Sequence, residues 1–215
     1  MKITLQSISN VLKRKQITYK GIHRRNYYKS IEDVKQKEKK FINEVEKVSV
    51  KEMVSIDETS IYVNDLPRKG WSLKGKKCII ESPLKFKKKS LLMAISNNKI
   101  VNYLITEKNI NSKIYLDFIK DSKINNKVII CDNVPFHKTK QVIKEIEKNN
   151  KLIFIPPYSP EYNPIEMVFS QIKRNLRFKY AELVDDLETN LANEIGNVSE
   201  NQLDKYFNHT FKFLV

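Results

Sequence analysis

Apolar residues change their spacing along the chain near residue 51. Before that point they recur every three or four positions within highly charged segments, which is typical of amphipathic helices. This spacing predicts helices over residues 3–15 and 29–47, joined by a short extended turn with a basic end at 17–25. In the second of these helices, Glu38 occupies a position where the spacing calls for an apolar residue.

After residue 51 the apolar residues gather in short runs with the composition of strands. Strands are expected at residues 51–63, 78–82, 91–96, 99–106, 127–132 and 151–157. Helices are expected at residues 110–123, 137–150, 163–179 and 181–211, and loops at 65–77 and 85–90. The polar sequence SNNK between the third and fourth strands favours a hairpin turn, so the first strands are expected to pair antiparallel.

This order of elements predicts an α/β fold, in which a mixed sheet is flanked by helices and preceded by a short helical extension. The apolar runs at 127–132 and 151–157 indicate strands that are buried on both faces. Functional sites in open sheets of this kind lie where the carboxyl ends of the strands meet. A chain of 215 residues suffices for one such domain with a small appendage.

The helix expected at 163–179 has two distinct faces. One carries an apolar stripe that must face the core, made of Ile165, Val168, Phe169, Ile172 and Leu176. Another begins with Glu166 and continues with Lys173 and Arg177. In the helix expected at 110–123, the inward-facing residues are Ile114, Phe118 and Ile119.

The composition narrows the classes of partner. Forty Lys and Arg against 25 acids give a net charge of +15, which attracts polyanions, nucleic acid first among them. AT-rich coding would also enrich lysine without any function. No apolar run is long enough to span a membrane. Cys78 and Cys131 both lie in apolar runs and are too few for a zinc site, so we expect buried, reduced thiols in an intracellular protein.

Three acids stand out by their positions. Asp57 lies within an apolar strand, Asp132 ends the buried strand at 127–132, and Glu166 falls in the first turn of a later helix. Each has a local interpretation: an edge residue facing water, the start of an Asx-turn, and a capping box in which Glu166 reaches back to Asn163. Their topology nevertheless allows the three carboxylates to converge. Glu58 is expected on the opposite face of the sheet from Asp57, because side chains alternate along a strand.

The stretches IDETS, CDNVPFHK and PPYSPEYNPIEMVF together resemble the catalytic motifs of DDE transposases of the mariner-like insertion-sequence superfamily. The resemblance covers about residues 50–180 and implies a ribonuclease-H-like fold. It also implies that Asp57, Asp132 and Glu166 are the catalytic triad and bind two Mg²⁺ or Mn²⁺ ions. Hard cations prefer such oxygen ligands, and two of them grip a phosphodiester. The implied partner is DNA, as transposon ends and target, with a homodimer joining two ends.

Other residues are expected to support the triad or to contact DNA. Asn133, His137 and Asn163 are placed around the metal-binding carboxylates, although His137 is as readily a helix-capping residue. Candidate DNA contacts are the basic residues Lys173, Arg177, Lys74, Lys76, Arg24 and Arg25. We expect Trp71 to pack beneath its basic loop rather than stack on a base.

The domain division follows from the resemblance. Residues 51–215 are expected to form the catalytic domain, and residues 1–50 a linking helix with the remnant of a helix-turn-helix region. A frameshift, decay of the gene or truncation would each explain that short region. The predicted function is metal-dependent cleavage at transposon ends followed by strand transfer to target DNA. The alternative is a catalytically silent, transposase-derived DNA-binding protein. A nuclease acting on RNA or damaged DNA fits the fold but not the last motif.

Overall fold

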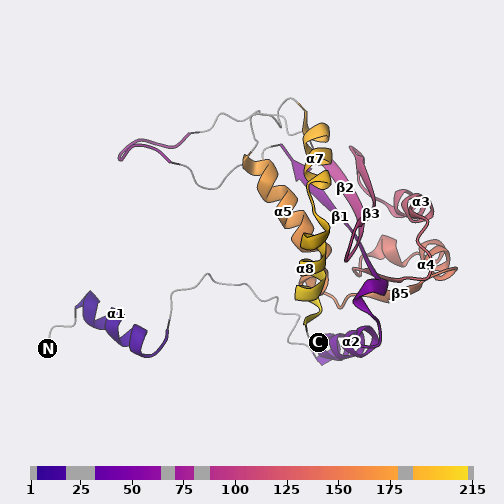
Figure 1. Ribbon diagram of the computed structural model, residues 1–215, viewed down its shortest axis with the longest axis horizontal. Helices are drawn as coiled ribbons and strands as arrows, with labels where there is room; N and C mark the ends of the chain where they lie inside the picture. The colour runs from indigo at the N-terminus through magenta and orange to yellow at the C-terminus, as the bar shows by residue number, and fades with distance from the viewer. Residues whose placement is uncertain (1–3, 18–31, 64–70, 80–87, 179–185, 213–215) are drawn as a thin grey trace.

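The structure, a computed structural model, describes residues 4–17, 32–63, 71–79, 88–178 and 186–212. Its centre is a five-stranded sheet in the order β3-β2-β1-β4-β5 (Figure 1). The strands are β1 (Met53–Tyr62), β2 (Lys88–Ser96), β3 (Ile100–Thr106), β4 (Val128–Cys131) and β5 (Lys151–Phe154). β2 pairs antiparallel with β1 and β3, whereas β4 pairs parallel with β1 and β5. The predicted mixed sheet is confirmed.

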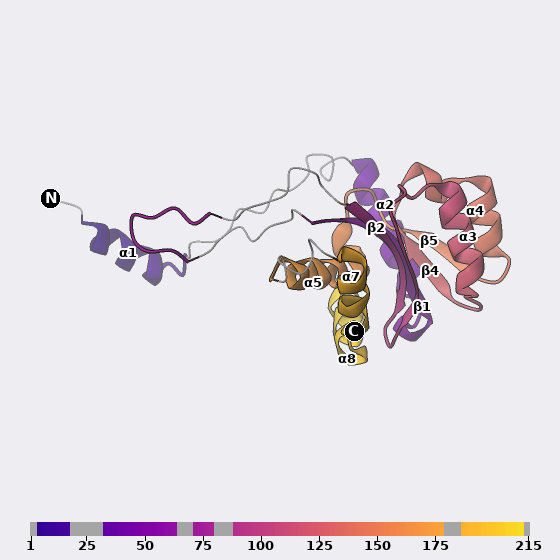
Figure 2. The ribbon, with the colours of Figure 1, turned by 90° about the horizontal axis from the view of Figure 1, so that it is seen from above.

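Helices cover both faces of this sheet. The helices of the described residues are α1 (Leu5–Arg14), α2 (Glu32–Val45), α3 (Ser112–Ser122), α4 (Lys140–Glu147), α5 (Ile165–Phe178), α7 (Leu187–Gly196) and α8 (Glu200–Thr210), and all of them except α1 pack against the sheet or its core. Short 3₁₀ turns lie at Val50–Glu52, Pro135–Lys138 and Pro160–Tyr162. Viewed from above, α3 and α4 lie on one face of the sheet, and α5, α7 and α8 lie on the other (Figure 2).

The alternation of side chains along the strands builds a separate core on each face. On the face of α3 and α4, Val54 and Ile56 of β1 pack in one buried cluster with Phe118 and Val142. On the opposite face the buried cluster combines strand residues with the apolar stripe of α5, namely Ile165, Val168, Phe169, Ile172 and Leu176. Each such side chain removed from water contributes roughly 1.5–3 kcal/mol. The stripe expected from the sequence is therefore confirmed.

Helix α2 packs against the same core. Phe41 and Val45 are buried in it, and the Phe41 ring lies 5.2 Å from the ring of Tyr162. The Tyr162 hydroxyl donates a hydrogen bond of 2.6 Å to Oε1 of Glu38. The acid that interrupts the apolar spacing of this helix thus has a polar partner in the 3₁₀ turn Pro160–Tyr162.

Several expected elements differ in extent. The helix expected from residue 137 begins at Lys140, because Pro135 starts a 3₁₀ turn and Thr139 is extended. The helical region at 181–211 contains two helices, and Ser199 starts the second with a capping box. Strand β2 begins at Lys88, within the segment expected to be a basic loop.

Burial also corrects some expectations. Tyr115 is fully buried in α3, whereas Ile114 is only half-buried. Strand β5 lies at the edge of the sheet and exposes Lys151, so it is not buried on both faces. Cys131 is buried as expected, but Cys78 is exposed and lies outside any strand, and so is the adjacent Ile79. The rest of the strand expected at 78–82 lies outside the described residues.

Helix α1 stands apart from the sheet in both views (Figures 1 and 2). None of its ten residues, all of which the structure describes, is buried. Across the described parts of the chain, no helix combines the length and apolar character needed to cross a membrane.

Candidate active site

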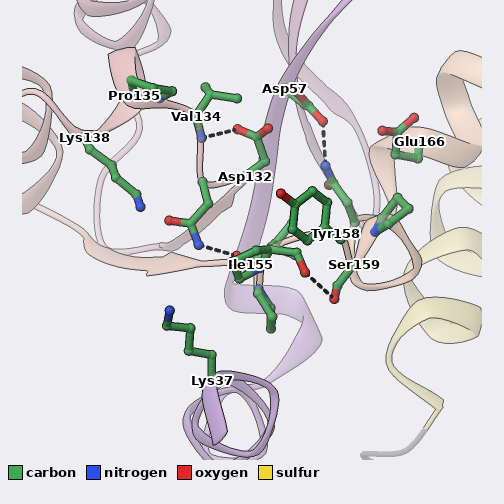
Figure 3. Close-up of a pocket in the computed structure, with 15 residues that line it drawn as sticks. Lys37, Asp57, Asp132, Val134, Pro135, Lys138, Ile155, Tyr158, Ser159 and Glu166 are labelled. Atoms are coloured by element: carbon green, nitrogen blue, oxygen red, sulfur yellow. Dashed lines mark hydrogen bonds between the residues drawn. The ribbon is translucent and has the colours of Figure 1, made fainter. Parts of the chain in front are cut away.

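The three predicted carboxylates line one pocket of about 510 Å³ (Figure 3). Asp57 comes from β1, Asp132 directly follows β4, and Glu166 lies in the first turn of α5. Because β1 and β4 are adjacent parallel strands, the two aspartates reach the same side of the sheet. The loop from β5 to α5 brings the glutamate to them.

Asp57 is buried and held at both oxygens. Its Oδ1 accepts a hydrogen bond of 2.7 Å from the Glu58 backbone N–H, and its Oδ2 accepts one of 2.7 Å from Nδ2 of Asn163. Burial raises the pKa of Asp57 well above its usual value, and the negative charges of Glu58, Asp132 and Glu166 raise it further. A carboxylate in this environment favours a cation as neighbour.

Asp132 begins the turn after β4, as its local interpretation predicted. The backbone N–H of Val134 donates to its Oδ1 at 3.4 Å. The neighbouring Asn133 donates from Nδ2 to the carbonyl of Ile155 at 2.9 Å. That bond joins the loop after β4 to the loop after β5, so it fixes two walls of the pocket relative to each other.

His137 lies behind Asp132 rather than in the pocket. Its Nδ1 is 2.7 Å from Oδ1 of Asp132, and its Nε2 is 3.2 Å from Oε2 of Glu58. Both are charge contacts whose geometry falls outside that of a hydrogen bond. Burial of the imidazole lowers its pKa, but its polar contacts, Asp132 first among them, outweigh burial and raise the pKa of His137 to about 11. The ring is fully buried against Tyr115, at 4.1 Å between centroids, and is not among the residues that line the pocket.

Glu166 faces the pocket and does not close a capping box. The Asn163 backbone N–H donates to the carbonyl of Pro160 at 3.0 Å instead. Burial raises the pKa of Glu166; Lys173 lowers it, and the charge of Asp132 raises it again. The capping-box prediction is therefore wrong, because the Asn163 amide is directed at Asp57 rather than at the helix.

Asn163 also contacts a residue that the sequence did not single out. The hydroxyl of Ser55 donates a hydrogen bond of 2.5 Å to Oδ1 of Asn163. The two residues are 108 positions apart in the chain, so no local pattern joins them.

Asp57 and Glu58 lie on opposite faces of β1, as the strand period predicts. Asp57 contacts Asn163 on the side of α5, whereas Glu58 contacts His137 on the side of α3. Glu58 therefore borders the site from behind the sheet and is not among the residues that line the pocket.

The predicted DNA contacts fall in different places. Lys173 lies on α5 and donates from Nζ to Oγ1 of Thr59 at 2.6 Å, close to Glu166. Arg177 lies in the last turn of α5 and is half-buried. Lys74 and Lys76 are exposed in the segment 71–79, which extends away from the sheet in both views (Figures 1 and 2). Arg24 and Arg25 lie outside the described residues.

Three further features were not expected from the sequence. Lys37 of α2 and Lys138 line the same pocket as the three acids, on the side away from Glu166 (Figure 3). Trp71 is fully exposed, so its expected packing beneath the loop is wrong. Tyr158 lines the pocket with a left-handed backbone, φ 59°, a conformation that costs a non-glycine residue energy and is typical of loops shaped for a site.

The donor set suits a hard divalent cation, since it consists of carboxylate oxygens. Among the described residues, however, no three His, Cys, Asp or Glu side chains already lie close enough together to enclose an ion. The three acids line the pocket, and burial, followed by the charges of neighbouring acids, raises the pKa of Asp57 and of Glu166. Binding an ion would therefore draw at least one carboxylate inward.

The sheet order and the helices on both faces define a ribonuclease-H-like fold. The sequence matches the DDE superfamily endonuclease family over residues 52–188, and the chain belongs to this family. The comparison with curated protein sequences gave no significant match.

Solved structures of the Mos1 transposase share the fold. A paired-end complex with the left transposon end has a TM-score of 0.73 at 18% identity, covering 97% of this chain and 68% of that one. A paired-end complex of the Mos1 mariner transposase with Mn gives 0.73 at 17%, covering 99% and 69%. The Mos1 catalytic domain gives 0.62 at 14%, covering 89% and 93%. At these identities the similarity shows the architecture alone.

Proposed function

We propose that this protein is a transposase that cleaves DNA strands at transposon ends and transfers the freed 3′-hydroxyl to target DNA. The observation that carries the proposal is the pocket lined by carboxylates from β1, from the loop after β4 and from α5, within the fold of an endonuclease family. Residues 51–215 would be its catalytic domain, and residues 1–50 a linking helix and a remnant of a helix-turn-helix region.

Asp57, Asp132 and Glu166 would hold two Mg²⁺ or Mn²⁺ ions. Bound ions of this kind neutralise the phosphodiester and activate the attacking hydroxyl. Structures of Mos1 with Mg and with Mn support this choice of metal. The protein would keep the carboxylates oriented toward the ions: Asn163 contacts Asp57, and His137 contacts Asp132. Such supporting contacts orient ligands and tune their affinity.

The basic residues around the pocket are suited to the DNA backbone. Lys37 and Lys138 border the acids on one side, and Lys173 borders them on another. Lysines in these positions would contact phosphates on either side of the reacting one, and such contacts position DNA without reading its sequence. Lys74, Lys76, Arg177, Arg24 and Arg25 would extend this surface.

A homodimer is the assembly that we propose, because transposition joins two ends of one element. The Mos1 structures include a paired-end complex with transposon DNA and a strand transfer complex, which supports this assembly by analogy.

Cleavage of labelled DNA tests the proposal. The full-length protein is incubated with Mn²⁺ and duplexes carrying the DNA that flanks its own gene, beside Asp132→Asn. We expect strand cleavage that requires the metal and is lost in the variant. Binding without cleavage by the unaltered protein would instead identify a catalytically silent DNA-binding protein.

A further inference from the structure

We propose that Ser55 and Asn163 form a buried relay that positions Asp57 and sets its place relative to Glu166. This inference deepens the proposed function and rests on it. Ser55 and Asn163 would be positioning residues, since they act through Asp57 and do not touch the DNA. Neither the family match nor the Mos1 similarity assigns them this role.

Hydrogen-bond chemistry allows a single orientation of the Asn163 amide. An ionised carboxylate can only accept hydrogen bonds, so the atom facing Oδ2 of Asp57 must be Nδ2. The amide oxygen then faces the Ser55 hydroxyl, which can donate to it. Ser55 thus selects the amide orientation that Asp57 needs. If the amide were flipped, Oδ1 of Asn163 would face Oδ2 of Asp57, and the two oxygens would repel each other.

The relay is shielded from water. The exposed fractions of Ser55, Asn163 and Asp57 are 0%, 3% and 7%. In such surroundings a hydrogen bond is stronger than at the surface, and a lost partner leaves a costly unpaired group. Oδ1 of Asp57 is already engaged by the Glu58 N–H. Each oxygen of Asp57 therefore has one fixed donor, which restricts rotation of the carboxylate and leaves further lone pairs for an ion.

The same asparagine contacts the helix that carries the third acid. Its carbonyl accepts a hydrogen bond of 3.2 Å from the Glu166 backbone N–H, and its own N–H donates to Pro160. Side chain and backbone of one residue thereby link the first carboxylate to the third. Ser55 in turn pairs in register with Ile130 of β4, two residues before Asp132. The hydrogen bond between Ser55 and Asn163 is thus connected through neighbouring residues to all three acids.

Calorimetric titration of the metal-free, full-length protein with Mn²⁺ tests this inference. We expect Ser55→Ala to weaken Mn²⁺ binding about 10-fold and Asn163→Ala up to about 100-fold, the range seen when partners of metal ligands are removed. Because Ser55 acts through Asn163, the double variant should bind like Asn163→Ala alone. Ser60→Ala, a change on the same strand outside the pocket lining, is the matched control and should bind like the unaltered protein.

A second measurement does not depend on metal. In the ¹⁵N-labelled metal-free protein, the side-chain NH₂ protons of Asn163 should exchange with solvent at least about 10-fold faster in Ser55→Ala, because a lost hydrogen bond of about 1.4 kcal/mol corresponds to that factor. The backbone amides of β1 should keep their protection. Circular dichroism establishes that each variant is folded, and Asn163→Asp, which keeps the acceptor for Ser55 but removes the donor to Asp57, replaces Asn163→Ala if the latter unfolds.

The outcomes separate the relay from the proposed function. Unchanged Mn²⁺ affinity in folded Ser55→Ala and Asn163→Ala, or effects of the two that multiply, would overturn the relay. Unchanged NH₂ exchange in Ser55→Ala would overturn it as well. If the unaltered protein and Asp57→Asn bind Mn²⁺ alike, the proposed metal site fails, and the exchange measurement alone then decides on the relay.

Discussion

Two adjacent acids on β1 have different surroundings and should have different roles. Asp57 lines the pocket with Asp132 and Glu166, whereas Glu58 contacts His137 behind the sheet. The contact of His137 with Asp132 gives Glu58 an indirect influence on the site. Position along the strand, rather than chemical type, separates a proposed metal ligand from a supporting residue.

The pair Asp57→Asn and Glu58→Gln tests this distinction. Asp57→Asn should lower the single-turnover rate of DNA cleavage by more than about 100-fold, since it removes a ligand itself, whereas Glu58→Gln should lower it by about 10-fold at most. Rates are measured at saturating DNA and Mn²⁺. Equal losses in the two variants would show that the face of the strand does not determine the role.

At the scale of single residues, the sequence revealed the groups whose chemistry is visible in a motif. That Asp57, Asp132 and Glu166 line one pocket could be predicted because charged side chains in apolar or turn settings are conspicuous and the topology allows them to converge. Ser55 could not, because its partner lies 108 residues away. The capping box that the local pattern suggested for Asn163 is absent, since a local helix-capping pattern competes with a tertiary contact that only the folded chain provides.

Helix α2 shows how one element is fixed to the core by a polar contact. The Tyr162 hydroxyl and the Glu38 carboxylate lie at the helix–loop junction, beside the packed rings of Phe41 and Tyr162. The carboxylate and burial both raise the pKa of Tyr162 above its usual value, burial more strongly. The hydroxyl therefore stays protonated and available as a donor.

Replacing Tyr162→Phe should lower the free energy of unfolding by about 1–2 kcal/mol, because the hydrogen bond to a charged acceptor is lost while the ring packing stays. Urea unfolding followed by circular dichroism measures the change. Tyr103→Phe, at an exposed ring of β3, is the control and should change little. Equal stabilities of the two variants would mean that the Glu38 contact does not hold α2 in place.

Helix α2 should also contribute to DNA binding through Lys37. Lys37→Ala and Lys138→Ala, each combined with Asp132→Asn to prevent cleavage, should weaken DNA binding and reduce the slope of log affinity against log salt by about one each. Lys39→Ala, an exposed change on the same helix outside the pocket lining, should alter both much less. Fluorescence anisotropy across a salt series supplies both quantities. An equal effect of Lys39→Ala would show that Lys37 contributes to DNA binding only through the general positive charge of the surface.

At the scale of elements, the periodicity of apolar residues predicted the regular faces of helices and strands but did not predict where a helix is interrupted. The strand alternation of β1 and the apolar stripe of α5 were visible because one face of each must be buried. The break between α7 and α8 was not anticipated, although Ser199 and Gln202 provide a capping box there. The apolar residues Cys78 and Ile79 suggested a strand, yet both side chains are exposed. A strand forms only where it can pair with a neighbouring strand, and composition does not specify that neighbour.

The molecule as a whole combines an acidic pocket with a strongly basic chain of net charge +15. Burial, and after it repulsion from neighbouring acids, raises the pKa of Asp57 and of Glu166, so keeping these two groups ionised opposes folding in the absence of metal. A ligand that binds only the folded state adds stability by mass action. Binding of the metal should therefore increase the free energy of unfolding of this protein.

Adding Mn²⁺ should raise the melting temperature measured by calorimetry. At 100 times the dissociation constant the gain is about 2.7 kcal/mol, which for a chain of this size corresponds to roughly 5–10 °C. Chelation with EDTA should reverse the shift, and Asp57→Asn should not show it. A shift of the same size in Asp57→Asn would place the stabilising ion elsewhere.

The position of the bound metal tests the central claim most directly. Crystals of the protein soaked in Mn²⁺ and measured at the manganese absorption edge give the ion positions from anomalous scattering. We predict two ions within the pocket, with Asp57, Asp132 and Glu166 as their protein ligands and with Glu166 turned toward them. Ions bound elsewhere on the molecule, or Glu166 turned away from ions in the pocket, would contradict the account.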